Sequence, residues 1–219
     1  MEKAFNGKKV LLTAGPTYEP IDPVRFIGNH STGKMGFALA ECFAERGAEV
    51  QLVAGPTSMK AQHPAITVTA VTTADEMYEA VKKLAPWADI WVFAAAVADY
   101  KPKVAADRKI KKSGEDLTIE LVKNVDIAAA LGKEKRKDQF SVGFALETDN
   151  EQSNAQEKLQ KKNLNMIVLN SLNDPGAGFK HDTNKITIIE SEGATAFELK
   201  QKSEVAQDIV NRIWERVYA

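Results

Sequence analysis

The sequence is poor in the residues that most metal and nucleophile sites require. Its 219 residues include one cysteine and three histidines. One cysteine excludes an intrachain disulfide and a cysteine-rich metal site, and we interpret Cys42 as a buried helix residue. His30, His63 and His181 lie in unrelated segments without H-x-x-x-H spacing, and no G-x-S-x-G motif occurs. The sequence therefore predicts neither a histidine metal site nor a serine nucleophile.

Long apolar runs and an excess of one charge are also missing. No apolar stretch approaches the roughly 20 residues of a membrane span, and the first residues lack the apolar core of a signal peptide. With 29 basic and 30 acidic residues, the formal net charge is -1. A general attraction to nucleic acid or to anionic membranes is therefore not expected. We expect a cytoplasmic protein whose phosphate binding, if any, depends on a local cluster.

Apolar runs alternate with helical patterns in the first half of the chain. A capping box from Thr73 to Glu76 marks one helix start. This alternation predicts a doubly wound, mostly parallel, Rossmann-like α/β sheet flanked by helices, in a single domain over residues 1–219. The predicted strands are 9–14, 49–54, 66–71 and 89–97, and the predicted helices are 33–46 and 73–84.

The second half has more varied patterns. Residues 99–116 form a long irregular segment, and we expect residues 100–116 to be mobile until nucleotide binds. Residues 185–190 and 195–199 predict a C-terminal hairpin. The remaining elements are strands at 117–121 (half-buried), 141–146 and 165–170, and helices at 151–162 and 202–218.

Candidate ligand sites follow from the strand ends. Ligands of doubly wound sheets bind beyond the carboxyl ends of the parallel strands. Three segments are predicted to meet there: AGPT at 14–17, AGPT again at 54–57, and AAAVADY at 94–100.

The stretch GNHSTGK, residues 28–34, matches most of the phosphate-loop pattern G-x-x-x-x-G-K-[ST]. Met35 stands where that pattern needs a magnesium-binding hydroxyl, and about 15 residues separate the segment from the first strand, so we exclude a phosphate loop of this type. Ser31 and Thr32 are predicted caps of the following helix. The amides from Ser31 to Lys34 would form an anion site at its N-terminus; the segment alone fits a capped helix without ligand equally well.

Lysines supply the second candidate. Lys109 belongs to RKIKK, residues 108–112, and Lys158 and Lys162 are one helical turn apart. These side chains could neutralise phosphates, although lysine runs are commonly solvated surface. No G-x-G-x-x-G motif follows the first strand. An NAD(P)-dependent oxidoreductase is therefore the weaker alternative.

Five long blocks together resemble the bacterial phosphopantothenate–cysteine ligases (phosphopantothenoylcysteine synthetases): TAGPTYEPIDPVRFIGNHSTGKMG, AAAVADY, KIKK, LVKNVDI and GFALET. The resemblance covers about residues 8–218. It implies a ligase of coenzyme A biosynthesis that activates 4′-phosphopantothenate with CTP as an acyl-cytidylate, releases pyrophosphate, and lets L-cysteine displace CMP. It also implies Mg²⁺ with the nucleotide, no flavin, and a homodimer with sheet or strand exchange near the active sites.

The resemblance further implies roles for individual residues. Asn29 and Lys109 are the expected catalytic residues, and the metal ligands stay open. CTP is expected to contact Phe93, Ala94, Ala95, Asp99, Lys109, Val125, Asp126, Ile127, Ala128, Phe144, Lys158 and Lys162. Phosphopantothenate is expected to contact Asn29, Ser31, Thr32, Gly33 and Lys34.

Overall fold

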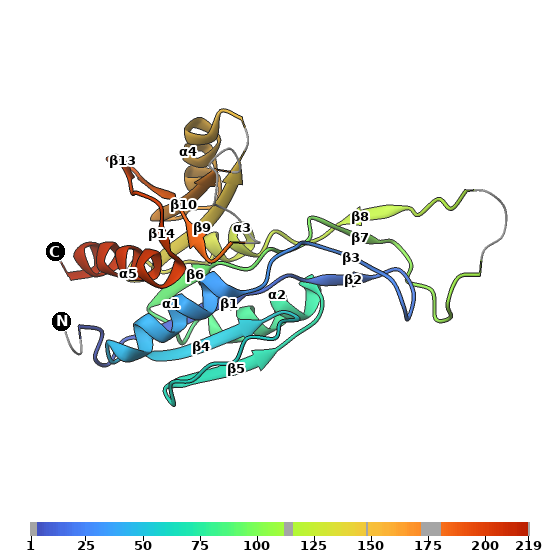
Figure 1. Ribbon diagram of the computed structural model, residues 1–219, viewed down its shortest axis with the longest axis horizontal. Coiled ribbons are helices and arrows are strands. Elements are labelled where there is room, and N and C mark those ends of the chain that lie inside the picture. Colours follow the sequence, from blue (N-terminus) through green and yellow to red (C-terminus); the bar gives the residue numbers. More distant parts are fainter. Residues whose placement is uncertain (1–3, 112–115, 148, 172–180, 219) are drawn as a thin grey trace.

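A computed structural model describes residues 4–111, 116–147, 149–171 and 181–218. Its centre is an eight-stranded sheet in the order β13-β12-β10-β9-β6-β1-β4-β5 (Figure 1). The six strands from β10 to β5 are parallel, and β12 and β13 are antiparallel. Their bounds are β1 Lys9–Ala14, β4 Glu49–Ala54, β5 Ile66–Ala70, β6 Ile90–Phe93, β9 Phe140–Glu147, β10 Met166–Ser171, β12 Ile186–Glu190 and β13 Gly193–Ala196.

The strand order confirms the predicted doubly wound sheet. The chain starts at β1, moves outward through β4 and β5, and returns to the other side of β1 through β6, β9 and β10. A strand such as β1 is apolar almost throughout because helices cover both faces of the sheet. The direction of winding reverses between β1 and β6, which is where ligands bind in folds of this kind.

Helices cover both faces. On one face α1 (Lys34–Glu45) packs against α5 (Lys202–Tyr218), as Figure 1 shows, and Phe43 and Ile209 are buried beneath them. On the other face lie α2 (Ala74–Leu84), α3 (Ile127–Gly132) and α4 (Glu151–Lys161). The capping box of α2 is present as predicted. No helix in the described part of the chain has both the length and the apolar character to cross a bilayer.

The first and last described residues meet near the amino-terminal ends of the parallel strands. Phe5 is fully buried and its ring contacts Phe43 and Tyr218, with centroids 5.0 Å and 6.0 Å away. Tyr218 closes α5, so the first described residues and the last helix share one apolar cluster.

Two hairpins project away from the sheet. The first pairs β2 (Tyr18–Pro20) with β3 (Phe26–Gly28), and the second pairs β7 (Tyr100–Pro102) with β8 (Leu121–Lys123). We call the described parts of residues 18–28 and 100–123 the arm; Figure 1 shows it extending far beyond the carboxyl ends of the strands. Large apolar side chains are exposed on it: Val24, Phe26, Val104, Leu117 and Leu121. A further small ladder joins β11 (Thr183–Asn184) to β14 (Lys200–Gln201).

Four predicted details of the secondary structure are corrected. Strand β6 ends at Phe93 rather than at 97, because the following amides bond to the turn after β1. Residues 117–121 do not form a half-buried strand; pairing starts at Leu121, outside the main sheet. The predicted C-terminal hairpin is confirmed, but its second strand starts at Gly193. Helix α1 is capped by Gly33 without any side-chain cap, so Ser31 and Thr32 are not its caps.

Candidate active site

Two adjoining pockets lie beyond the carboxyl ends of the parallel strands. The larger has a volume of about 490 Å³ and the smaller about 360 Å³. Both are lined by Ala95, Val97, Asp99 and Phe144, so this group forms their common wall. Ala95 to Asp99 follow β6, next to the point where the winding of the sheet reverses. Ligands in the two pockets would therefore meet along the 95–99 segment.

Hydrogen bonds from the β1 side hold the 95–99 segment in place. The amide of Ala95 donates to Thr13 Oγ1 at 3.1 Å, and that of Ala98 donates to Thr17 Oγ1 at 3.0 Å. Between them, the amide of Ala96 donates to the carbonyl of Gly15 at 2.9 Å. Thr13 and Thr17 are buried, so these bonds are shielded from water. The wall between the pockets is therefore fixed before any ligand arrives.

The two AGPT turns pack against each other under this wall. Gly15 has a φ of 78°, which favours glycine, and its carbonyl accepts the Ala96 amide. A Cβ on Gly55 would lie 1.7 Å from the carbonyl oxygen of Pro16, so no other residue fits there without displacing the backbone. Thr57 Oγ1 donates to the carbonyl of Thr32 at 2.7 Å. The repeated sequence thus joins two neighbouring strand ends. It also supports residues 28–34, which we call the glycine segment.

The smaller pocket contains all five residues predicted for phosphopantothenate: Asn29, Ser31, Thr32, Gly33 and Lys34. Asn29 Nδ2 donates to the carbonyls of Ala96 (3.0 Å) and Val97 (3.3 Å), which ties the glycine segment to the common wall. Gly33 is the N-cap of α1 with a φ of 82°, and its amide donates to Ser31 Oγ at 3.3 Å. The start of α1 therefore faces this pocket.

Polar residues that the sequence reasoning did not single out complete the smaller pocket. Asn170, Asn184 and Lys202 line it, and Asp182, which is not a lining residue, pairs with Lys34. Asn184, almost fully buried, donates through Nδ2 to Asn170 Oδ1 at 3.0 Å. Burial lowers the pKa of Lys202, and the neighbouring Lys34 ammonium lowers it further. These residues come from 170–202, far along the chain, where no local pattern marks them.

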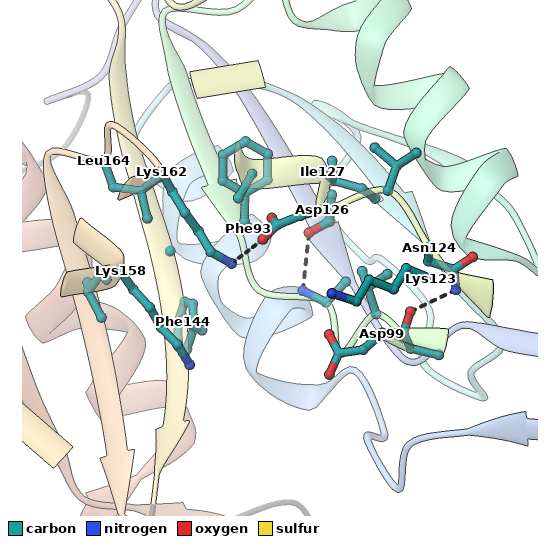
Figure 2. A pocket seen from close by; sticks show the side chains of 18 of the residues that line it. Phe93, Asp99, Lys123, Asn124, Asp126, Ile127, Phe144, Lys158, Lys162 and Leu164 are labelled. Atoms are coloured by element: carbon teal, nitrogen blue, oxygen red, sulfur yellow. Dashed lines mark hydrogen bonds and ion pairs between the residues drawn. The ribbon is translucent and has the colours of Figure 1, made fainter. Parts of the chain in front are cut away.

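The larger pocket is built between β6, β9, α3 and α4. Asp126 caps α3 by accepting the Ala129 amide at 3.0 Å, and it pairs with Lys162 at 2.9 Å. Lys158 pairs with Glu147, whose side chain is mostly buried. Figure 2 shows Lys158 and Lys162 on one side of the pocket and Asp99 and Lys123 on the other. The pocket thus combines aromatic surface with lysines that are already oriented by carboxylates.

Most residues predicted for CTP line this larger pocket: Phe93, Ala95, Asp99, Val125, Asp126, Ile127, Ala128, Phe144, Lys158 and Lys162. Ala94 lines the smaller pocket instead. Lys109 lines neither pocket, because its segment lies on the arm. Lys112, also in the RKIKK segment, lies outside the described residues.

Asn124 is a pocket residue that sequence reasoning missed. Its Nδ2 donates to the carbonyl of Ala98 at 2.8 Å, which links β8 to the common wall. Its Oδ1 is buried and, within the described ranges, has no hydrogen-bond partner. Its place in LVKNVDI, one of the five blocks that carry the resemblance, is the sequence signal that points to it.

The donor set suits a metal carried by phosphates better than one held by the protein. No group of three or more metal-ligating His, Cys, Asp or Glu side chains occurs in the part of the chain that the structure describes. Asp126 is already paired with Lys162, which leaves Asp99 as the carboxylate lining both pockets. Mg²⁺ usually takes one or two protein carboxylates together with substrate phosphates, so these residues fit that ion.

The strand order and the two pockets define a doubly wound α/β protein of the Rossmann type, with its site at the strand ends. Within that class, the chain belongs to the DFP family, described as the DNA/pantothenate metabolism flavoprotein C-terminal domain, whose model matches residues 5–217.

Curated relatives cover nearly the whole chain. A "Cysteine/Cysteine sulfinic acid decarboxylase" from an unknown prokaryotic organism is 54% identical over 99% of this chain and 61% of its own length. The Coenzyme A biosynthesis bifunctional protein CoaBC of Haemophilus influenzae is 45% identical over 97% of this chain and 52% of its own. The protein of that name in Escherichia coli is 42% identical over 94% and 52%. The chain thus spans only 52% to 61% of the length of these relatives.

Solved structures confirm the fold. The crystal structure of the C-terminal domain of a CoaBC protein is 40% identical, covers 99% of this chain and 98% of that one, and has a TM-score of 0.84. A Cab2 variant in complex with phosphopantothenate-cysteine has a TM-score of 0.78 at 18% identity and covers 96% of this chain and 87% of that one, which is evidence for the fold alone.

Proposed function

We propose that this chain is a single CTP-dependent ligase domain that joins 4′-phosphopantothenate to L-cysteine in coenzyme A biosynthesis. The observation that carries the proposal is the pair of pockets that meet along Ala95 to Asp99. A reaction between a nucleotide and a phosphorylated acid needs two anion sites with their reacting ends in contact. Family membership and the CoaBC relatives support the choice of substrates.

The nucleotide is assigned to the larger pocket. Phe93 and Phe144 offer apolar surface for the base, and the small Ala95 lets a ligand approach the backbone of the common wall. Lys158 and Lys162 already lie at its edge, paired with carboxylates that would share them with the phosphates. Mg²⁺ carried by the triphosphate would add charge neutralisation when bound.

Phosphopantothenate is assigned to the smaller pocket. Its phosphate would accept bonds from the amides at the start of α1, where the helix dipole favours an anion. Lys34 would add a positive charge. Its carboxylate would then lie near Asn29 and the common wall, facing the nucleotide.

The chemistry follows from this arrangement. A carboxylate oxygen of phosphopantothenate attacks the α-phosphorus of CTP, the bond to the β-phosphate bridging oxygen breaks, and pyrophosphate leaves. The amine of cysteine then attacks the acyl carbon, loses a proton, and displaces CMP to leave an amide. The first step brings two anions together and the second expels CMP as an anion, so fixed donors and lysines are the groups that lower the barriers.

The name of the relative that is 54% identical describes a different reaction, decarboxylation. This chain aligns with 61% of that protein, so the named activity belongs to a longer chain. Our proposal assigns the ligase reaction, and no flavin, to the part that this chain represents.

Pyrophosphate release is the decisive experiment. We expect release when phosphopantothenate is supplied with CTP, much less with ATP or GTP, and CMP release only after cysteine is added. Thermal stabilisation by NADPH but not by CTP would favour the oxidoreductase alternative. CTP binding without pyrophosphate release would indicate a nucleotide-binding module without the chemistry.

The proposal includes a homodimer formed through the arm. The arm exposes apolar side chains, and it carries Lys109, which lines neither pocket of its own chain. A second copy packed on the arm would bury those side chains and receive Lys109 at the phosphates of its own site.

Subunit mixing tests this arrangement. Lys109→Gln and Asn29→Ala are each expected to retain about a hundredth of normal turnover when tested alone. Mixed dimers should regain activity at one of their two sites, because the Lys109→Gln subunit keeps Asn29 and receives Lys109 from its partner. Mixed dimers as inactive as the parents would place both residues in one subunit.

A further inference from the structure

Asp22 is a buried carboxylate that lines neither pocket. It lies in the turn between β2 and β3, and its side chain is 0% exposed. Its Oδ1 accepts hydrogen bonds from the amides of Val24 and Arg25, both at 2.9 Å. Its Oδ2 accepts one from Nε of Arg25 at 3.0 Å. A second guanidinium nitrogen of Arg25 also donates to Oδ2, and this arginine holds the pKa of Asp22 well below its usual range. The carboxylate is therefore charged and fully hydrogen-bonded.

The same pair of residues reaches across to the segment that carries Lys109. Asp22 Oδ2 accepts the amide of Ile110 at 3.1 Å, and Arg25 donates to the carbonyl of Ile110 at 3.0 Å. A third bond runs from the amide of Ala106 to the carbonyl of Ile21 at 2.9 Å. Both backbone groups of Ile110 are thus bound to residues more than 80 positions earlier. Because Ile110 follows Lys109 directly, these bonds fix the backbone at that lysine.

We propose that Asp22 is a positioning residue that, together with Arg25, holds Lys109 in place for the reaction. The inference rests on the proposed function, because Asp22 can affect the reaction only through Lys109. A turn between β2 and β3 needs the bonds to Val24 and Arg25 alone. The bonds to Ile110 add nothing to that turn; they join the two hairpins of the arm.

The first test is Asp22→Asn, which keeps the size of the side chain and removes its charge. We expect kcat to fall roughly tenfold to a hundredfold, since small displacements of a catalytic group have effects of that order. The KM for CTP should stay within about twofold, because neither Asp22 nor Ile110 lines a pocket. Glu120→Gln is the matched control: it removes an exposed carboxylate from the same arm, paired with Lys103, and should leave kcat unchanged.

The double variant separates positioning from general stability. If Asp22 acts through Lys109, Asp22→Asn should cause no further loss of kcat in a Lys109→Gln background. Losses that multiply in the double variant, or an Asp22→Asn enzyme with normal kcat, would overturn the inference while leaving the proposed function intact. Normal turnover by Lys109→Gln alone would remove Lys109 from the mechanism. It would overturn the role of Lys109 as well as that of Asp22.

Hydrogen exchange on the unmodified protein covers the case in which Asp22→Asn does not fold. The Ile110 amide donates to a buried carboxylate, whereas the Lys109 amide donates to no acceptor among residues 4–111, 116–147, 149–171 and 181–218. We expect Ile110 to exchange at least tenfold more slowly than Lys109. Equal rates would show that the segment is not held, which would overturn the inference.

Discussion

We call the carboxyl ends of the parallel strands, with the turns that follow them, the rim. The rim and the arm hold their residues in opposite ways. At the rim, the 95–99 segment is bonded to buried threonines and rests on two interlocked glycine turns. On the arm, pairing is limited to strands of three residues, and large apolar side chains face solvent. Its two hairpins are joined by the polar contacts of Asp22 and Arg25. The rim is therefore complete within one chain, whereas the arm has the character of a surface that needs a partner.

This contrast separates the predicted site residues into two groups. Those at the rim line a pocket in the isolated chain, as Phe93, Asp99 and Asn29 do. Lys109, on the arm, does not.

Gly55→Ala should damage the rim most. Its Cβ would lie 1.7 Å from the carbonyl oxygen of Pro16, and backbone cannot move aside as a side chain can. We expect the free energy of unfolding to fall by about 3 kcal/mol, measured by urea denaturation. Gly7→Ala is the control: no atom lies within 4 Å of its Cβ, and only the φ of 75° is unfavourable, at about 1 kcal/mol. Equal losses in the two variants would contradict the interlocked turns.

Asn29→Ala should affect catalysis rather than folding. The side chain lines the smaller pocket and bonds to the common wall, so we expect turnover with cysteine to fall about a hundredfold. Its effect on CTP affinity, measured by isothermal titration, should stay within about twofold. Asn211→Ala, which removes a bond to Arg46 away from both pockets, is the control. Loss of CTP affinity with turnover retained would reverse the assignment of the two pockets.

Leu121→Asp tests the arm as a dimer surface. A charge placed in an apolar interface should raise the dimer dissociation constant at least tenfold, or about 1.4 kcal/mol. Val68→Asp on β5 is matched closely, since both side chains are 43% exposed, and it should leave the dimer unchanged. Sedimentation velocity over a range of concentrations would measure both. A similar response in the two variants would remove the arm from the interface.

Glu190→Gln should have the smallest effect, at the edge of the sheet away from both pockets. Burial alone would raise the pKa of Glu190, but hydrogen bonds from Arg216 and Arg212 outweigh it and lower the pKa. A lowered folded-state pKa means that the stabilisation is present above the ordinary value of 4.5 and is lost as the pH falls through the lowered value. We expect a loss of about 1 kcal/mol at neutral pH, since both arginines are partly exposed.

That loss should disappear in acid. Melting temperatures of Glu190→Gln and the unmodified protein, measured from pH 7 downward, should converge only after the pH has fallen below the ordinary value of 4.5. A constant difference across that range would mean that charge pairing is not the cause.

The sheet was predictable from sequence because its strands are apolar runs that need no distant information. The helices were predictable from their amphipathic spacing. The capping box at Thr73 predicted the N-cap residue of one of them. The arm was not predictable in this way. Its strands pair Tyr100 with Lys123 and Tyr18 with Gly28, and no periodicity marks segments of three residues.

The site divides similarly. The rim residues were predicted from blocks that resemble a known family, and most of them line a pocket. Without that resemblance, the glycine segment fitted a phosphate site and a capped helix equally well. Asp22 and Asn184 were missed because their importance comes from partners 88 and 14 residues away. A buried polar residue of this kind looks in sequence like any other turn or strand residue.

The meeting of Phe5 with Tyr218 at the amino-terminal edge has a practical consequence. The first and last described residues therefore lie next to each other at the amino-terminal ends of the strands, opposite the pockets, and neighbouring ends of this kind tolerate fusion. A tag, a surface tether or a second catalytic module could be attached at either end, or at both, without standing between the substrates and their entrance.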